Sequence, residues 1–396
     1  MNSITFDHEL GHLAPSPEQP LRVLILLGGL GVGGAETQAI NLAAELQAMG
    51  HTVELVTLAD GVLRAFAEAH RLRLQVLRRF NGLSVTALPD FMQRLRRSRP
   101  QVVYAFMEIQ WLLALTAVAL LPRSLRPRVV LGLRTTDYDI RPSAPKERIV
   151  RALVQRSAAR ADLLIANSRR GLDSFRRSIP NSPTGVVVPN GIDVSRFAPS
   201  TSSRAYWRRM WSIPAEATVV GHVGRFDPVK GHELLLQAFA LECGADPSCH
   251  LVCIGNCEPN RLAELEQLVR SLGIEGRVHF FPAQLDTSSL YPAFDVLALT
   301  SFREGFPNVV AEAMSCGVPA VVTDCGASGE IASSLGEVVA VGSIDAFADG
   351  LSRLLNRRSA TLAHACRSHV HSSFDIHVAA ARTAAALQSL CSATSK

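Results

Sequence analysis

Two short runs in this 396-residue chain carry charged side chains of the kinds that bind phosphate and sugar hydroxyl groups. The first run, Gly224–Gly231, follows an apolar stretch, precedes a helical pattern and contains Arg225 and Lys230. Arginine can bind a phosphate with two hydrogen bonds, and lysine adds a point charge. The alternative interpretation is that both are solvated surface cations. Their position at the end of a predicted strand argues against it.

The second run combines two carboxylates with the start of a predicted helix. Glu304 follows the apolar stretch DVLALT, and Pro307 suits the first turn of the helix that comes next. Backbone N–H groups at such a helix start lack partners within the helix, and Glu312 lies about one turn further on. Carboxylates bind sugar hydroxyls and N–H groups bind phosphate oxygens, so the run suits a nucleotide sugar. A carboxylate that complements the helix dipole and a solvated helix face are the structural alternatives.

A third run, Gly28–Glu36, is dense in glycine and also lies between a predicted strand and a predicted helix. Glycines there let backbone N–H groups approach a phosphate. Gly29, Gly31 and Gly34 satisfy the pattern G-x-G-x-x-G, for which Asp60 is a loose candidate for the acidic partner. A phosphate or sugar near this loop is favoured over the structural alternative, a tight turn without a ligand. A nicotinamide-dependent oxidoreductase is a function that only this loop supports.

The elements that must position these runs form an alternation of apolar stretches and helical patterns. Such alternation predicts an α/β protein with parallel sheets covered on both faces. We expect two Rossmann-like doubly wound domains that face each other across a cleft, with ligands at the carboxyl ends of the strands. The predicted strands span residues 21–27, 51–58, 101–106, 128–133, 161–168 and 185–191, then 218–226, 250–255, 277–282, 295–300 and 319–324; predicted helices include 35–50, 232–242, 262–273 and 308–317.

Composition narrows the class of protein. Apolar residues make up 47% and charged residues 19%, which is compatible with a buried core and excludes a disordered chain. Residues 1–195 contain 24 Lys and Arg against 16 Asp and Glu, a net charge of +8, whereas the remainder has −3. The basic half indicates a partner with phosphates or an anionic surface.

Cysteine usage and apolar runs indicate a cytoplasmic protein. All eight cysteines follow residue 242, and the spacing Cys249-x3-Cys253-x3-Cys257 suggests a metal site at first sight. On an extended strand these thiols would lie too far apart, so we predict reduced core thiols and no metal. The longest apolar run, 111–121, is shorter than the ~20 residues that span a bilayer, and residues 1–20 lack the features of a signal peptide.

The three runs in this order resemble the retaining GT-B glycosyltransferases of family 4, also called glycosyl transferases group 1. The resemblance covers about residues 21–390, and its last motif is long and specific. The matching motifs are Gly33-Gly34-Ala35-Glu36, Pro189-Asn190-Gly191-Ile192-Asp193, Gly224 to Gly231, and Glu304 to Pro319.

The resemblance implies transfer of a sugar from a nucleotide diphosphate sugar to an acceptor hydroxyl, with retention and without a cofactor. Arg225 and Lys230 would hold the donor diphosphate, and Glu304 would contact the donor sugar at its reacting face; these three are the predicted catalytic residues. Glu312 would hold the ribose hydroxyls. The other donor-binding positions implied are Gly31, Gly33, Phe281 beside the base, Phe306, Asn308 and Val309.

The composition along the chain and the resemblance together predict a domain plan. A flexible leader (1–20) would precede an acceptor domain (21–195), a connection (196–217) and a donor domain (218–372). The last helix, 373–390, would return to the N-terminal domain. Implied partners are a nucleotide sugar and a carbohydrate or polyprenyl-linked sugar acceptor, with no nucleic acid, in polysaccharide or lipid-linked oligosaccharide synthesis.

The chain departs from the family pattern on the acceptor side. Many members carry a histidine after the fourth strand, where Phe106 stands here, so no role of that histidine carries over. Glu108 and Arg134 are weaker acceptor-side candidates, with a helix N-terminal acid as the alternative for Glu108. Asp137-Tyr138-Asp139 imitates a metal-binding D-x-D motif, but we interpret it as a loop.

A run of arginines among apolar residues suggests peripheral contact with the inner face of the plasma membrane; a solvated surface is the alternative. The arginines are Arg64, Arg71, Arg73, Arg78, Arg79, Arg94, Arg96, Arg97 and Arg99, and Phe80 is among their apolar neighbours. Two further functions remain open. A nonhydrolysing sugar-nucleotide epimerase would convert a nucleotide sugar without an acceptor, and a catalytically silent scaffold would bind one without turnover.

Overall fold

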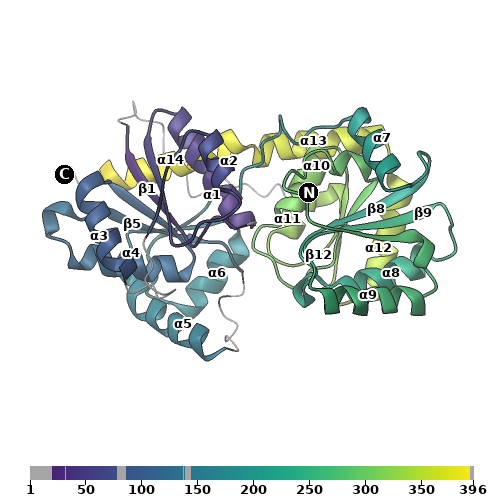
Figure 1. Ribbon diagram of the computed structural model, residues 1–396, viewed down its shortest axis with the longest axis horizontal. Coiled ribbons are helices and arrows are strands. Elements are labelled where there is room, and N and C mark those ends of the chain that lie inside the picture. Colours follow the sequence, from purple (N-terminus) through teal and green to yellow (C-terminus); the bar gives the residue numbers. More distant parts are fainter. Residues whose placement is uncertain (1–19, 32, 78–85, 137, 139–143, 393–396) are drawn as a thin grey trace. The chain divides into compact units, whose positions relative to one another are not determined.

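The computed structural model describes residues 20–31, 33–77, 86–136, 138 and 144–392 (Figure 1). The described chain forms two compact units. Unit 1 comprises Met1–Gly191 and Ile376–Lys396, and unit 2 comprises Ile192–Asp375. The predicted leader, 1–20, lies outside the described residues apart from Pro20.

Unit 1 is built around a seven-stranded sheet in the order β3-β2-β1-β4-β5-β6-β7, with every neighbouring pair parallel. Chain order reverses between β1 and β4, which is where doubly wound sheets bind ligands. The strands are β1 (Arg22–Leu27), β2 (Thr52–Thr57), β3 (Arg73–Val76), β4 (Val102–Phe106), β5 (Arg128–Leu133), β6 (Leu163–Ala166) and β7 (Gly185–Val187). The helices are α1 (Gly34–Ala48), α2 (Arg64–Ala69), α3 (Ala87–Ser98), α4 (Glu108–Leu120), α5 (Pro145–Ser157), α6 (Arg169–Ser178) and α14 (Ile376–Ser392).

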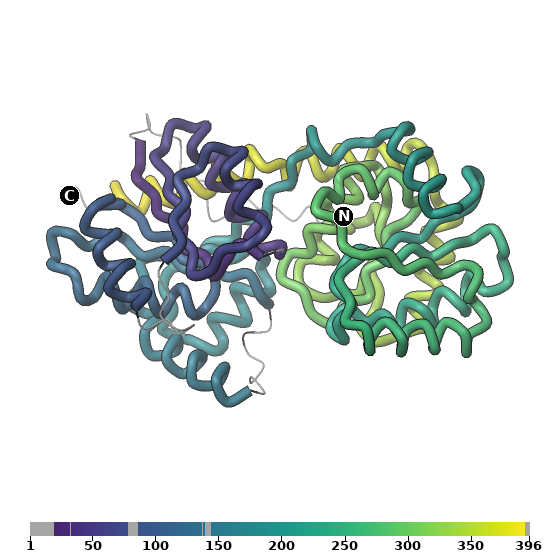
Figure 2. Tube along the Cα trace, viewed as in Figure 1, coloured from purple at the N-terminus to yellow at the C-terminus, as the bar shows by residue number. Residues whose placement is uncertain are grey.

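Successive residues of β1 enter opposite cores, as the alternation of side chains along a strand requires. Leu24 and Leu26 pack on the face that also holds Trp111, whereas Ile25 packs with Ile40 of α1. The last helix, α14, contributes Leu387 to this second core and lies beside α1 (Figure 2). Both faces of the sheet are therefore covered, which explains why β4 reads as a continuous apolar run.

Unit 2 repeats the plan with a six-stranded parallel sheet in the order β10-β9-β8-β11-β12-β13. The reversal of chain order falls between β8 and β11. The strands are β8 (Thr218–Val223), β9 (Cys249–Ile254), β10 (Val278–Phe281), β11 (Val296–Leu299), β12 (Ala320–Thr323) and β13 (Glu337–Val339). The helices are α7 (Thr201–Met210), α8 (His232–Cys243), α9 (Pro259–Ser271), α10 (Asn308–Ser315), α11 (Ser328–Ala332), α12 (Ile344–Arg357) and α13 (Ala360–Phe374).

The segment 196–217, which the sequence analysis treats as a connection, belongs to unit 2 and contains α7. Its anchor is Arg208, whose side chain is 2% exposed. The guanidinium donates hydrogen bonds to the carbonyls of Ala215, Ala217 and Ala293 and to Asp295 Oδ2 at 2.7 Å. A buried charge is tolerated only with such compensation, so α7 is fixed to unit 2 by paired polar groups.

The expected α/β fold with two Rossmann-like sheets is confirmed at the level of each unit. Cys249 and Cys253 lie within β9, and all eight cysteines are free thiols. In the described part of the chain, no cluster of three His, Cys, Asp or Glu side chains could hold a metal ion. None of the described helices combines the length and apolarity that crossing a membrane requires.

Candidate functional site

The charged residues singled out in the second half of the sequence gather at one edge of the unit 2 sheet. Arg225 and Lys230 follow β8, and Glu304 follows β11. Because β8 and β11 are parallel neighbours, their carboxyl ends meet at the same edge. This edge is also the point where chain order reverses, the place at which open α/β sheets bind ligands.

The loop after β8 is tied to the loop after β11 by backbone and hydroxyl hydrogen bonds. The Thr300 hydroxyl donates to the Lys230 carbonyl at 2.8 Å, and the Phe302 N–H donates to the Val229 carbonyl at 2.8 Å. Gly231 has φ +66°, and a Cβ atom there would clash with the Thr300 carbonyl. Glycine is therefore required at the turn that brings Lys230 against the β11 loop.

Lys230 and Glu304 form an ion pair in which Nζ lies 2.6 Å from Oε1. The same carboxylate oxygen accepts a hydrogen bond from the Ser301 hydroxyl at 2.6 Å. Side-chain exposures of 20% for Lys230 and 12% for Glu304 limit screening by water. Lys230 and Glu304, two of the predicted catalytic residues, thus contact each other. This edge of the sheet therefore presents a cation and a carboxylate side by side.

Arg225, the third predicted catalytic residue, has a different environment. Its side chain is 74% exposed, and its guanidinium lies 3.1 Å from Asp227. The structure therefore places Arg225 at the rim of the same loop, where it can turn toward an anion at little cost in packing.

The helix after Glu304 begins as the sequence indicates. Pro307 directly precedes α10, and Asn308 and Val309 occupy its first turn, both half-buried. The Phe306 side chain is buried and packs edge-on against Phe374, with ring centroids 5.5 Å apart. Only the backbone of Phe306 is therefore available to a ligand.

Glu312 lies on α10 and accepts a hydrogen bond from the Tyr291 hydroxyl at 2.5 Å. Burial raises the pKa of Glu312 to about 7, although the hydrogen bond from Tyr291 acts in the opposite direction. Burial and the nearby Glu312 carboxylate raise the pKa of Tyr291, so the phenol stays protonated and keeps donating. Glu312 is thus a carboxyl group that exchanges its proton near neutral pH.

Phe281 ends β10 and is half-buried. Its ring stacks on Trp211 with centroids 5.8 Å apart and packs against the unit 2 core. The Phe281 side chain is therefore part of the core packing. The backbone next to it is the part that could contact a base.

In unit 1, Gly31 and Gly33 lie in the loop between β1 and α1. A Cβ atom at Gly31 would meet nothing within 4 Å, whereas at Gly33 it would clash with the Glu36 carboxylate. The acidic residue weighed for a dinucleotide site, Asp60, forms an ion pair with Arg64 at 2.7 Å. Its carboxylate is therefore engaged locally.

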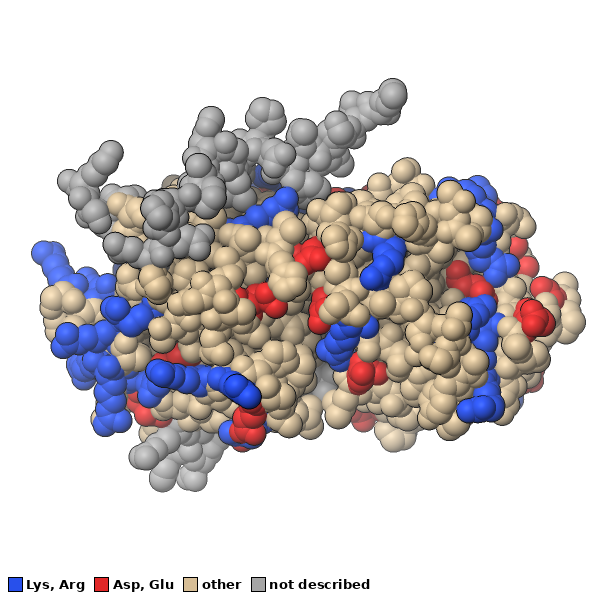
Figure 3. Space-filling model, turned by 90° about the horizontal axis from the view of Figure 1, so that it is seen from above, with Lys and Arg blue, Asp and Glu red and all other residues tan. Residues whose placement is uncertain are grey.

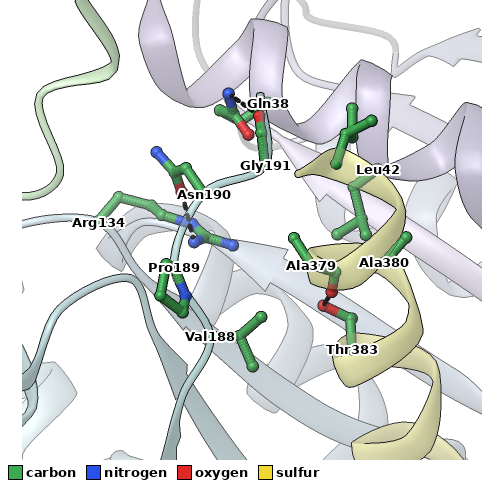
Figure 4. A pocket seen from close by; sticks show the side chains of 11 residues that line it. Gln38, Leu42, Arg134, Val188, Pro189, Asn190, Gly191, Ala379, Ala380 and Thr383 are labelled. Carbon is green, nitrogen blue, oxygen red and sulfur yellow. Dashed lines mark hydrogen bonds between the residues drawn. The ribbon is translucent and has the colours of Figure 1, made fainter. Parts of the chain in front are cut away.

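The acceptor-side candidates of unit 1 are Arg134 and Glu108. Arg134 donates hydrogen bonds to Tyr104 Oη at 2.8 Å and to Asn190 Oδ1 at 3.1 Å, and its guanidinium lies 4.6 Å from the Phe106 ring centroid. Arg134 lines a cavity of about 20 Å³ between α1, α14 and residues 188–191, in which Figure 4 shows it beside Asn190. That volume holds about one water molecule.

Glu108 is the first residue of α4 and pairs with Arg151, with Oε1 and Nε 2.8 Å apart. This is the helix N-terminal position that the sequence analysis weighs as its alternative. Asp137 and Asp139 of the D-x-D run lie outside the described residues.

Sequence reasoning missed Ser301 and Tyr291, the hydroxyl donors to Glu304 and Glu312. Ser301 is a polar residue immediately after the apolar run of β11, which is a usable signal. Tyr291 stands 21 residues before Glu312, in a short 3-10 helix (Tyr291–Ala293), and no local pattern connects the two.

Two family models match this chain, one in each half. The family model for glycosyl transferases group 1 matches residues 203–369, and the model for glycosyltransferase family 4 matches residues 32–196. The D-inositol 3-phosphate glycosyltransferase of Corynebacterium jeikeium is 30% identical over 324 residues, which cover 74% of this chain and 76% of that protein.

Two other relatives with the same name match over shorter stretches. The protein of Salinispora tropica is 34% identical over 46% of this chain and 40% of its own length. That of Salinispora arenicola is 33% identical over 57% of this chain and 54% of its own length. The chain thus spans about half the length of these two relatives.

Solved structures share the architecture. HepE from Anabaena in complex with UDP-glucose has a TM-score of 0.80 and 24% identity, over 93% of this chain and all of that chain. Sucrose-phosphate synthase from Thermosynechococcus elongatus has a TM-score of 0.78 and 20% identity, over 94% of this chain and all of that one. The fold is therefore that of the GT-B proteins. The chain belongs to the glycosyl transferases group 1 family, and the predicted resemblance is confirmed for the family and the fold.

Proposed function

We propose that this protein transfers a sugar from a nucleotide diphosphate sugar to an acceptor hydroxyl, with retention at the anomeric carbon. The observation that carries the proposal is the contact between Lys230 and Glu304 at the β8–β11 edge. A cation suited to a diphosphate and a carboxylate suited to sugar hydroxyls are held together there, beside the N-terminus of α10.

In the proposed reaction the bond between the anomeric carbon and the diphosphate oxygen breaks, and a bond to the acceptor oxygen forms. Lys230, Arg225 and the N–H groups at the start of α10 would stabilise the charge that develops on the diphosphate. The proton of the acceptor hydroxyl would pass to the departing phosphate, as the family resemblance implies. Glu304 would orient the donor sugar, and Glu312 would bind the ribose hydroxyls.

The identity of the donor and acceptor rests on relatives. HepE binds UDP-glucose in its solved complex, which supports a uridine nucleotide as the first donor to test. The curated relatives are named for D-inositol 3-phosphate, whereas the sequence analysis predicts a carbohydrate or polyprenyl-linked acceptor. Arg134 offers a cation to either kind of acceptor, because all of them carry phosphate groups or hydroxyls.

Peripheral contact with an anionic membrane remains part of the proposal. Figure 3 shows Lys and Arg gathered over unit 1, at the left of the view. Of the run that suggested the contact, Arg71, Arg73, Arg96, Arg97 and Arg99 are exposed, Arg64 and Arg94 pair with carboxylates, and Arg78, Arg79 and Phe80 lie outside the described residues. Co-sedimentation with vesicles that does not depend on their anionic lipid content would count against this contact.

A thermal-shift panel of UDP, GDP, ADP and their common sugar conjugates tests the proposed function. A diphosphate that binds only the folded state raises the unfolding midpoint. We expect a shift with one nucleotide series that is lost in Arg225→Ala and Glu312→Ala. No shift at millimolar ligand with a folded protein would contradict the proposal. In a separate turnover assay, conversion of the nucleotide sugar in the absence of an acceptor would indicate an epimerase instead.

A further inference from the structure

Ser301 is a buried serine whose hydroxyl contacts the predicted catalytic carboxylate. It lies two residues beyond the end of β11, and its side chain is 0% exposed. Its Oγ donates to Glu304 Oε1 at 2.6 Å, a distance typical of a hydroxyl that donates to an ionised carboxylate.

The position of Ser301 is itself fixed by the end of the neighbouring strand. Its carbonyl accepts hydrogen bonds from the Thr323 hydroxyl at 2.5 Å and from the Cys325 thiol at 3.3 Å. Thr323 and Cys325 are both buried, so this anchor belongs to the interior of unit 2. The hydroxyl is therefore presented from a rigid support, as precise placement of a functional group requires.

Lys230 and Ser301 both donate to Glu304 Oε1. A bound diphosphate would affect these two donors differently. The Lys230 ammonium carries a charge that a diphosphate would attract, and its long side chain can follow that charge. The serine hydroxyl is neutral, short and tied to the sheet. Once Lys230 turns to a diphosphate, the Ser301 hydroxyl still holds Glu304 Oε1.

We propose that Ser301 is a positioning residue, which keeps the Glu304 carboxylate oriented toward the donor sugar while Lys230 binds the diphosphate. This inference rests on the proposed function, because it assigns Glu304 to the sugar and Lys230 to the phosphates. It predicts that removal of the hydroxyl weakens recognition of the sugar and leaves recognition of the free nucleotide intact.

The test compares Ser301→Ala with Ser301→Thr, which retains the hydroxyl, and with Ser315→Ala as a matched control. Ser315 is equally buried and its hydroxyl donates to the Phe197 carbonyl at 2.6 Å, so the control loses a comparable bond elsewhere. Affinities for UDP, GDP and ADP and for their glucose conjugates are measured by calorimetry on the full chain.

We expect Ser301→Ala to lose roughly tenfold or more in the preference for the sugar conjugate over the free diphosphate, the range for a hydrogen bond to a charged group. The KM for the donor should rise in parallel, and kcat/KM should fall at least as much. Ser301→Thr should restore the preference, and Ser315→Ala should keep it. An unchanged preference in Ser301→Ala would overturn the proposal.

A measurement without any nucleotide separates this proposal from the proposed function. In protein labelled with ¹³C at glutamate carboxyls, the signal absent from Glu304→Gln reports Glu304. Loss of the hydrogen bond from Ser301 should move the ¹³C carboxyl signal of Glu304 in Ser301→Ala and not in Ser315→Ala. A Glu304 signal that stays in place in Ser301→Ala would exclude Ser301 as a support of Glu304. If no nucleotide bound but the signal moved, the proposed function would fail and the contact of Ser301 with Glu304 would stand.

Discussion

Lys230 Nζ lies 2.6 Å from Glu304 Oε1, although 74 residues separate the two along the chain. Both side chains are mostly withdrawn from water, so each charge depends on the other for compensation. A diphosphate that binds at this edge must therefore compete with Glu304 for Lys230. The two residues assigned to the proposed reaction therefore also stabilise the ligand-free protein by pairing with each other.

The first prediction concerns this ion pair. Lys230→Met should lower the free energy of unfolding by about 1–3 kcal/mol, less than for a fully buried pair, because it leaves Glu304 charged and without its cation. Adding Glu304→Gln should recover most of that loss. Urea unfolding of the four proteins of this cycle measures the coupling, and additive losses would show that the contact contributes nothing.

Arg225→Ala should change binding but not stability. The side chain is exposed, so we expect the unfolding free energy to stay within about 0.5 kcal/mol of wild type. Affinity for the free nucleoside diphosphate should fall roughly tenfold or more, as expected for loss of a charged hydrogen bond to phosphate. Arg353→Ala is the matched control, since Arg353 is also exposed and pairs with a carboxylate, Glu337, at 3.0 Å. Equal affinities in the two variants would remove Arg225 from the site.

Glu312 should give the protein a pH dependence near neutrality. Its pKa of about 7 lies above the ordinary value of 4.5, so the folded state binds the proton more tightly than the unfolded state. Its contribution to stability is therefore greatest below pH 4.5 and is lost as the pH rises toward 7. Glu312→Gln should remove this slope from urea unfolding measured across that window.

Nucleotide binding should show the opposite trend, because the charged carboxylate is the better acceptor for ribose hydroxyls. We expect affinity to fall by up to about tenfold per pH unit below pH 7, the limit for one coupled proton. Tyr291→Phe removes the hydrogen bond that lowers the pKa of Glu312, so the midpoint of this titration should move to higher pH. Calorimetric titrations at several pH values measure it, and a midpoint unchanged by Tyr291→Phe would contradict the role of the phenol.

Gly326→Ala should disturb the loop that carries Glu304. Gly326 has φ +58°, and a Cβ atom there would clash with the carbonyls of Glu304 and Gly305. We expect a loss of more than about 1 kcal/mol in unfolding free energy from the backbone conformation alone, and reduced binding of the sugar conjugate. Gly276→Ala is the control, because a Cβ atom at Gly276 would meet nothing within 4 Å. A thermal midpoint equal to that of the control would show that the loop accommodates the methyl group.

Much of the site could be predicted because it consists of charged residues just after apolar strands. Lys230 and Glu304 are predicted in this way, whereas Glu312 and the start of α10 at Asn308 follow from the helical pattern after Pro307. The environments of these residues could not be predicted. Arg225 and Lys230 look alike in sequence, yet one is exposed beside Asp227 and the other is half-buried against Glu304.

The sequence by itself determined the α/β pattern, the family and the chemical groups available at the strand ends, because these depend on local periodicity and residue type. Tertiary structure decided which of these side chains contact one another. β8 pairs with β11 although β9 and β10 come between them in the chain, and this strand order brings Ser301 and Glu304 to Lys230. Burial, which raises the pKa of Glu312 toward neutrality, likewise arises only when distant segments pack together.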